Sequence, residues 1–231
     1  MKPLVKMTKT ELTVFCLMAI CSGFMIGIGG AASLLANALY GNAGKLIGAA
    51  LFSLGIFAIV TYEMRLFTGM VADIPSMGLK NTWRLPVCFF GNIIGVAIVA
   101  VVIYFSPVSD KIVPIAKDLI LGKLNAEYWP IKVFCSAILC GGLITLSVWS
   151  VKYAPKKGLS PTVGVLFPII VFAFCGFDHC IANMLYFYYL GEFSWRVIGY
   201  ILLGVLGNIV GGVILPLISL LRTYSQNRNN S

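Results

Sequence analysis

The residues of this chain that are most able to do chemistry gather in one segment, residues 171–184, with the sequence VFAFCGFDHCIANM. The segment holds the only histidine of the chain, His179, beside a carboxylate, Asp178, and an amide, Asn183. An imidazole can exchange hydrogen bonds or a proton near neutral pH. The segment interrupts a long apolar run, where ionisable groups are costly and typical of functional sites. It therefore predicts a functional site inside a membrane.

The composition indicates an integral membrane protein. The chain has 231 residues, of which 59% are hydrophobic and 11% charged, and its mean hydropathy is +0.95. Apolar stretches long enough to cross a bilayer recur along it. The N-terminus lacks a short apolar segment with a small-residue cleavage site, so we expect no removable signal peptide. The net charge of +9 comes mostly from basic residues near span ends, which favours anionic lipid heads over nucleic acid as partners.

The apolar stretches predict an all-α polytopic membrane protein, with residues 1–231 forming a single channel domain. We expect six transmembrane helices, near residues 11–40, 45–62, 85–105, 128–152, 162–190 and 195–221. A turn at residues 41–44 separates the first two. The polar residues 106–127 are interpreted as a long outer loop, and residues 222–231 as a frayed tail. The lysines and arginines favour both termini in the cytoplasm, with the chain in the inner (plasma) membrane.

The two halves of the chain share an interrupted helix followed by a matching motif. The second apolar run ends in a polar interruption at residues 62–71, which contains Glu63, Arg65 and Thr68. The motif GNIIG at residues 91–95 follows this interruption, and GNIVG at residues 207–211 follows the interruption at His179. Three spans in each half, about residues 11–105 and 128–222, predict inverted repeats with broken second and fifth helices. Paired interruptions of this kind indicate a central transport site.

Other kinds of site are not favoured by the sequence. The paired cysteines are five residues apart, which turns a helix by about 140° and places them on different faces. One histidine without a partner four residues away does not predict a metal site. Asp178, His179 and Cys180 are consecutive, so they project in different directions, and we expect neither an enzyme nor a cofactor. A neutral-solute channel of aquaporin type stays an alternative, although its paired Asn-Pro-Ala motifs are absent.

Five motifs in this order resemble those of the formate/nitrite transporter family, which includes formate, nitrite and hydrosulfide channels. They are LFTG at residues 66–69, GNIIG at 91–95, SVW at 147–149, GFDHCIANM at 176–184 and GNIVGG at 207–212. The resemblance implies an aquaporin-like protomer in a homopentamer, with one pore in each protomer. This chain departs from the family pattern at Arg65, where an acidic residue is usual, and at Gly141, where an asparagine is common.

Carried over by matched position, the resemblance implies a role for each of a set of residues. Thr68 and His179 would face each other at the pore centre. Hydrophobic constrictions would come from Leu66, Phe172, Phe67 and Ile56. The broken segments would be supported by Asn183, Asn208, Asn92, Asp178 and Arg65. A lysine that attracts anions, either Lys132 or Lys123, would lie near the start of the fourth span.

The resemblance and the residues together predict a channel or transporter for small monovalent anions of weak acids. Hydrosulfide is preferred, because Arg65 makes the neighbourhood of the first break more basic. Nitrite or formate transport with proton coupling is the alternative. His179 is expected to exchange a proton with the solute between two constrictions, or else only to orient the break through hydrogen bonds.

Overall fold

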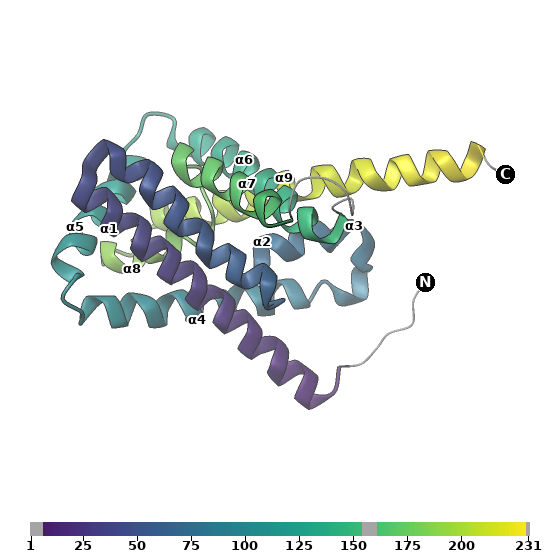
Figure 1. Ribbon diagram of the computed structural model, residues 1–231, viewed down its shortest axis with the longest axis horizontal. Helices are drawn as coiled ribbons and strands as arrows, with labels where there is room; N and C mark the ends of the chain where they lie inside the picture. Colours follow the sequence, from purple (N-terminus) through teal and green to yellow (C-terminus); the bar gives the residue numbers. More distant parts are fainter. Residues whose placement is uncertain (1–6, 154–160, 230–231) are drawn as a thin grey trace.

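The chain is described by a computed structural model that covers residues 7–153 and 161–229, and the covered residues form helices and loops without a strand (Figure 1). The elements are α1 (Lys9–Thr61), α2 (Phe67–Met70), η1 (Val71–Asp73), α3 (Ile74–Met77), η2 (Leu79–Asn81), α4 (Arg84–Tyr104), α5 (Ser109–Leu124), α6 (Trp129–Tyr153), α7 (Pro161–Cys175), α8 (Asn183–Leu190) and α9 (Trp195–Asn229).

Helix α1 is a hairpin of two antiparallel legs (Figure 1). The reversal lies at Gly41, whose φ of 54° and ψ of −122° a residue with a side chain rarely adopts. The legs approach closely, because a Cβ atom added at Gly44 would lie 2.2 Å from the carbonyl oxygen of Ala36. The predicted turn at residues 41–44 is thus confirmed.

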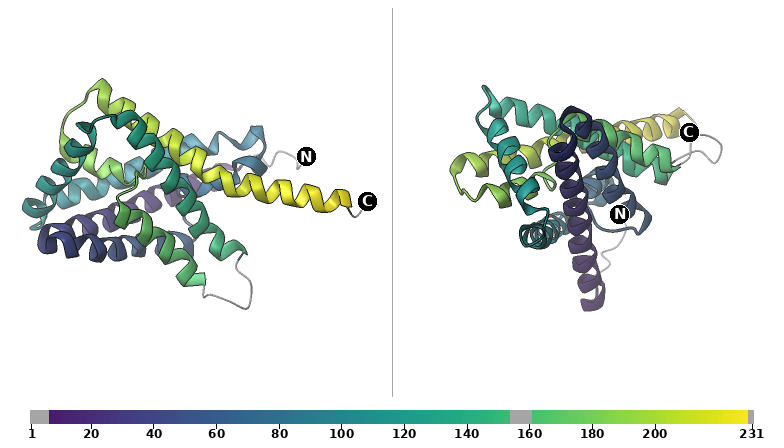
Figure 2. Two further views of the ribbon diagram at one scale, coloured as in Figure 1. Left: turned by 90° about the horizontal axis from the view of Figure 1, so that it is seen from above. Right: turned by 60° about the vertical axis from the view of Figure 1, so that its left-hand side comes forward.

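The long helices pack in two main pairs, with α1 against α4 and α6 against α9, and α7 lies against both α1 and α6 (Figure 2). Among the described residues, four helices are long and apolar enough to cross a membrane, and α7 is a shorter apolar helix. One of the four is the 53-residue α1 hairpin. Many large apolar side chains on these helices are exposed, as expected of a surface that faces lipid.

Both expected interruptions are present. The second leg of α1 ends at Thr61, and the chain restarts as α2 at Phe67 after an extended Leu66. Helix α7 ends at Cys175 and α8 begins at Asn183, so residues 176–182 form the second break. Non-helical backbone at membrane depth is tolerated where protein covers it. Most of the second break is covered, with His179 1% exposed, and Leu66 at the end of the first break is 3% exposed. Tyr62, Glu63 and Arg65 of the first break are exposed.

Two expectations about polar segments are wrong. Residues 106–127 are not a loop, because most of them form α5, which packs against α8 and α1. The buried residues of α5 recur every fourth position and so make one apolar face: Ile112, Ala116, Ile120 and Leu124. The expected frayed tail is instead the end of α9, which stays helical through Asn229. The basic connection at residues 154–160 lies outside the described residues.

Candidate functional site

The two breaks meet at one hydrogen bond. The Thr68 Oγ1 atom in α2 lies 3.0 Å from Nε2 of His179 in the second break. Both side chains are buried, Thr68 completely and His179 to 1% exposure. The pairing joins residues 111 positions apart, so only the meeting of the two breaks creates it.

The other ring nitrogen of His179 fixes its tautomer. Nδ1 accepts from the backbone N–H groups of Ile181, at 3.3 Å, and Ala182, at 3.1 Å. A neutral imidazole carries one N–H, and a nitrogen that accepts two hydrogen bonds does not carry it. We therefore assign the proton to Nε2, which donates to Thr68 Oγ1 and leaves the threonine hydroxyl hydrogen free for another acceptor.

An asparagine holds each break in the same way. Asn92 of α4 accepts from the N–H of Phe67 at 2.8 Å and donates to the carbonyls of Arg65 and Ala19, at 2.8 and 2.7 Å. The side chains of Asn92 and of Asn208, its counterpart in α9, are fully buried.

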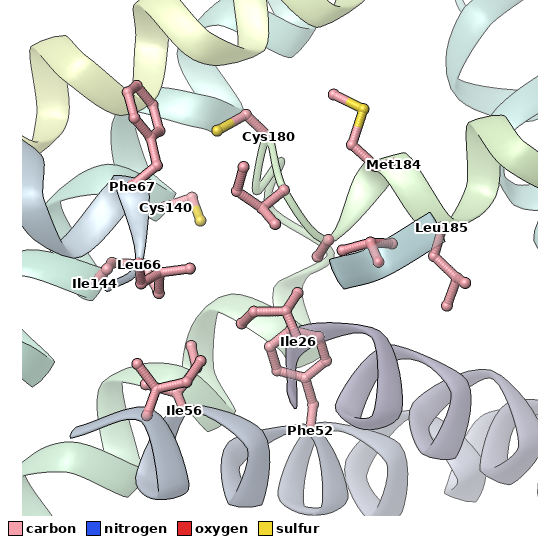
Figure 3. Close-up of a cluster of buried hydrophobic side chains, with 14 of the residues drawn as sticks. Ile26, Phe52, Ile56, Leu66, Phe67, Cys140, Ile144, Cys180, Met184 and Leu185 are labelled. Atoms are coloured by element: carbon pink, nitrogen blue, oxygen red, sulfur yellow. The ribbon is translucent and has the colours of Figure 1, made fainter. Parts of the chain in front are cut away.

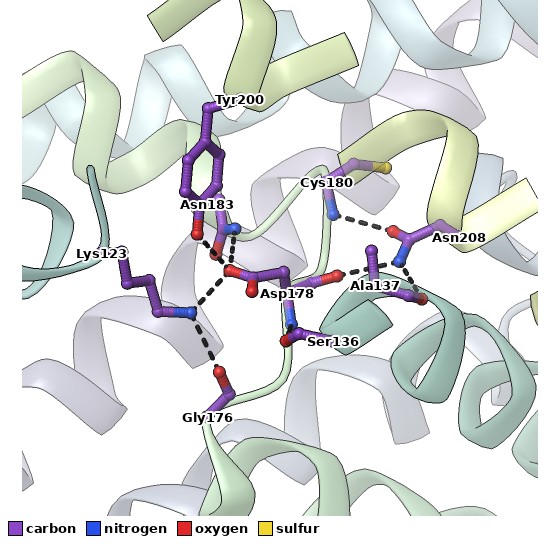
Figure 4. A network of polar contacts seen from close by, with 9 residues as sticks. All are labelled: Lys123, Ser136, Ala137, Gly176, Asp178, Cys180, Asn183, Tyr200 and Asn208. Atoms are coloured by element: carbon purple, nitrogen blue, oxygen red, sulfur yellow. Dashed lines mark hydrogen bonds and ion pairs between the residues drawn. The ribbon is translucent and has the colours of Figure 1, made fainter. Parts of the chain in front are cut away.

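Asn208 of α9 repeats this pattern at the second break. It accepts from the N–H of Cys180 at 2.9 Å and donates to the carbonyls of Asp178 and Ala137, both at 2.8 Å (Figure 4). Each amide thus bridges residues i and i+2 of a break and one carbonyl of a neighbouring helix, so the breaks are fixed rather than loose loops.

Asp178 is the centre of a second polar network (Figure 4). Its Oδ1 atom accepts from Lys123 Nζ at 2.6 Å, Tyr200 OH at 2.5 Å and Asn183 Nδ2 at 2.9 Å. Its backbone N–H donates to Ser136 Oγ at 2.9 Å. Lys123 also donates to the carbonyl of Gly176, at 2.9 Å. The carboxylate is thereby turned away from the Thr68–His179 pair and locks the second break to α5, α6, α8 and α9.

Apolar side chains surround the Thr68–His179 pair. The Phe172 ring stacks on the His179 ring at 5.8 Å between centroids and meets the Phe52 ring edge-on at 5.4 Å. Ile56 and Leu66 are buried in the same core, which is completed by Ile26 from the other leg of α1 (Figure 3).

Two cavities approach the pair from different sides. The first, of about 450 Å³, lies near the turn of the α1 hairpin and is lined by residues that include Phe52, Phe172 and His179. We call it the hairpin cavity. The second, of about 360 Å³, is the Leu66 cavity, lined by residues that include Ile59, Leu66 and Val148.

The cavities are separated by a short apolar barrier. Phe52 and Ile59 lie on one helical leg seven residues apart, which corresponds to roughly 10 Å. Ile56, between them, is 0% exposed. The site is therefore a hydrogen-bonded Thr68–His179 pair in a thin apolar barrier with a cavity on each side, and the Thr68 hydroxyl is its free donor.

The predicted residues that lie at this barrier are Thr68, His179, Leu66, Phe172 and Ile56. Four others hold the breaks, namely Asn92, Asn208, Asn183 and Asp178. The remaining four lie elsewhere or at the cavities. Phe67 lines neither cavity, because its ring packs on Phe89 of α4 at 5.1 Å. Arg65 is exposed and lines the Leu66 cavity. Lys132 is exposed and lines neither, whereas Lys123 lines the hairpin cavity and contacts the second break.

Three residues of the site were missed by the sequence reasoning. Phe52 packs on Phe172, and Tyr200 and Ser136 bond Asp178. An apolar residue within an apolar helix carries no signal of its own. Tyr200 carried a weak signal, since a phenol within an apolar helix needs a hydrogen-bond partner.

Comparison with known proteins places this architecture. The sequence model of the formate/nitrite transporter family matches residues 3–222. The chain belongs to the formate/nitrite transporter family. It is 29% identical over 198 residues to the uncharacterized transporter YrhG of Bacillus subtilis, covering 76% of this chain and 70% of that protein. It is 27% identical over 192 residues to the formate channel FocB of Escherichia coli, covering 78% and 67%.

The fold is also shared with solved structures. A pentameric formate channel with formate bound superposes with a TM-score of 0.75 over 94% of this chain and 99% of that chain, at 22% identity. An ion channel of the same family gives a TM-score of 0.76, covering 93% of this chain and 91% of that chain, also at 22% identity. This formate/nitrite transporter family member thus has the fold of channels in its family, and those relatives are channels and transporters rather than enzymes.

Proposed function

We propose that this family member is a channel that passes small monovalent anions of weak acids through a pore in each protomer. The observation that carries the proposal is the hydrogen-bonded pair Thr68–His179, buried in an apolar barrier between two cavities. A hydrated ion does not fit such a barrier, whereas a small solute that accepts a hydrogen bond from the Thr68 hydroxyl does. The sequence contains no catalytic nucleophile motif, and we do not propose catalysis.

The barrier selects for solutes that can shed their charge. A bare anion in an apolar interior faces a penalty of many kcal/mol. Formate, nitrite and hydrosulfide are conjugate bases of weak acids, so each can cross the barrier as the neutral acid. In the proposed pathway Leu66, Ile56 and Phe172 exclude water, while the Thr68 hydroxyl offers a hydrogen bond at the midpoint. The Nε2–H of His179 donates to Thr68 Oγ1 and so holds that hydroxyl in place.

The geometry of His179 defines its part in any proton exchange. Protonation of the neutral ring would occur at Nδ1, which already accepts two backbone N–H groups. An imidazolium therefore forms only if residues 179–182 move those groups away. We infer that His179 at rest is a neutral hydrogen-bond donor, and that proton exchange through it accompanies a movement of the second break.

The proposed membrane arrangement has six spans. The two legs of α1, helices α4, α6 and α9, and the broken α7–α8 would cross the bilayer, in halves related as inverted repeats. The matching hydrogen bonds made by the Asn92 and Asn208 side chains support this relation, because the same amide atoms contact equivalent positions of each break. Both termini in the cytoplasm and the inner membrane remain our proposal, as does a homopentamer, a state that the solved formate channel adopts.

Two solutes are the leading candidates. Hydrosulfide is favoured by the departure from the family pattern at Arg65, although Glu63 and Asp73 line the same Leu66 cavity and offset its charge. Formate is the alternative and is supported by relatives that are named formate channels. Reconstituted vesicles tested with formate, nitrite and hydrosulfide side by side separate them, since the physiological class should give the fastest saturable flux. If vesicles with the protein take up all three solutes no faster than protein-free vesicles, transport is refuted.

The pore centre is tested by His179→Asn and His179→Ala. Asparagine can still donate a hydrogen bond and alanine cannot. We therefore expect flux through the asparagine variant to exceed flux through the alanine variant about tenfold, which corresponds to about one hydrogen bond. If proton exchange passes through His179, both variants also lose the pH dependence of the wild type. Undiminished flux with an unchanged pH profile in both variants would remove His179 from the mechanism.

A further inference from the structure

The hairpin cavity contains a cation that neither the sequence motifs nor the site above explains. Lys45 follows the turn of the α1 hairpin and lines this cavity with Asn37 and Asn42. It is exposed, and among the described residues that line the cavity none is acidic. Its ammonium group therefore adds an uncompensated positive charge at the cavity mouth.

The other lysine of the cavity does not have a free charge. Lys123 forms an ion pair with Asp178 at 2.6 Å and donates to Gly176. Most of its field is cancelled by that carboxylate, and two of its donors are occupied. Lys132, the alternative anion-attracting lysine, lines a different cavity, with Asp118 and Asp178. Neither lysine is thus equipped to collect an anion in the hairpin cavity, whereas Lys45 is.

Polar groups continue from Lys45 toward the barrier. Asn37 Oδ1 is buried and has no hydrogen-bond partner among the described residues, and Ser33 lies one turn further along the same leg. His179 lines the other end of the cavity. Oδ1 can accept a hydrogen bond from a protonated acid, and the ammonium can bind its conjugate base. The cavity therefore has partners for both forms of the solute.

We propose that Lys45 and Asn37 form an entry site that collects the weak-acid anion in the hairpin cavity before it reaches the barrier. This inference rests on the proposed function and names the residues that set affinity at one entrance. A single positive charge in a solvated mouth concentrates monovalent anions about two- to fivefold at low ionic strength, and salt screens the effect.

The test compares Lys45→Gln, Lys45→Arg and wild type in vesicles with one known orientation, using formate as the probe. Lys117→Gln is the matched control, since Lys117 is an exposed lysine of α5 and is absent from the cavity lining. At about 20 mM salt we expect Lys45→Gln to raise the half-saturating formate concentration about two- to fivefold for entry from the hairpin side. Lys45→Arg and Lys117→Gln should stay near the wild type.

The difference should collapse at about 500 mM salt, where the screening length falls to a few ångströms. Half-saturation for entry from the opposite side should change less than twofold. A passive pore keeps the ratio of maximal flux to half-saturation equal from both sides, so both quantities are measured. Lys45→Gln with wild-type half-saturation at low salt would overturn the entry site, whereas wild-type vesicles without formate, nitrite or hydrosulfide flux would overturn the proposed function instead.

Discussion

Asn92 and Asn208, whose side chains hydrogen-bond the two breaks, offer the sharpest test of how the breaks are held. Asn208→Leu replaces the amide by a side chain of nearly the same shape, so it removes three hydrogen bonds with little change in volume. The N–H of Cys180 and the carbonyl of Asp178 would then be buried without partners, whereas the Ala137 carbonyl keeps its hydrogen bond within α6. Each unsatisfied group costs about 1–3 kcal/mol, so we expect a loss of about 2–6 kcal/mol.

A loss of about 4 kcal/mol corresponds to a melting temperature lower by roughly 8–16 °C for a chain of this size. The assay is thermal unfolding of the purified protein in detergent, together with anion flux in vesicles. Asn92→Leu removes the matching bonds at the first break and should give a similar decrease. The two asparagines share no partners, so the double variant should lose the sum of the two effects.

The reasoning is refuted if either single variant melts within about 2 °C of the wild type, because buried backbone groups would then be satisfied by other means. A variant that melts much lower but transports normally at low temperature would show that these hydrogen bonds serve stability alone. A variant with near-normal stability and no flux would contradict the energetic argument while leaving the position of the breaks as the cause.

Three further predictions concern single contacts. Lys123→Met should lower the free energy of unfolding by about 2–3 kcal/mol, since Asp178 loses its cation but keeps Tyr200 and Asn183. In a melting assay, the Lys123→Met/Asp178→Asn double variant should recover part of this loss. Gly141→Ala should lower the melting temperature, because its Cβ would lie 2.3 Å from the Asn208 carbonyl oxygen, whereas Gly142→Ala, with its nearest atom at 3.7 Å, should not. Thr68→Val should reduce flux about tenfold in vesicles and lower stability by about 1–3 kcal/mol, because the buried Nε2–H of His179 loses its acceptor. Flux equal to that of the wild type would exclude the hydroxyl from the pathway.

The Gly141 contact also explains a departure from the family pattern. An asparagine at this position would place its Cβ against the backbone of α9, as close as 2.3 Å. In this chain α6 and α9 therefore approach at a separation that only glycine permits. The exchange belongs to helix packing and gives no reason to favour one anion over another.

Much of the arrangement could be predicted because polar residues in apolar runs are conspicuous. His179 and Thr68 interrupt hydrophobic segments, and the GNIIG and GNIVG motifs mark the helices that bracket the breaks. The polar segment containing Lys123 was misjudged, because its lysines and aspartates suggested a loop. The four-residue spacing of Ile112, Ala116 and Ile120 was a helical signal in the sequence. In the structure these residues are buried on one face of α5, which packs against α8.

The sequence by itself determined the membrane character, the places where helices break and the residue types at those breaks, since all three depend on local composition. Only the tertiary structure decided which groups meet. It joined Thr68 to His179, separated by 111 positions, and paired Asp178 with Lys123 and Tyr200 rather than with Thr68 or His179. It also left Lys45, not Lys123 or Lys132, with a free charge in the hairpin cavity. These pairings depend on how helices approach in space, and spacing along the chain does not encode that distance.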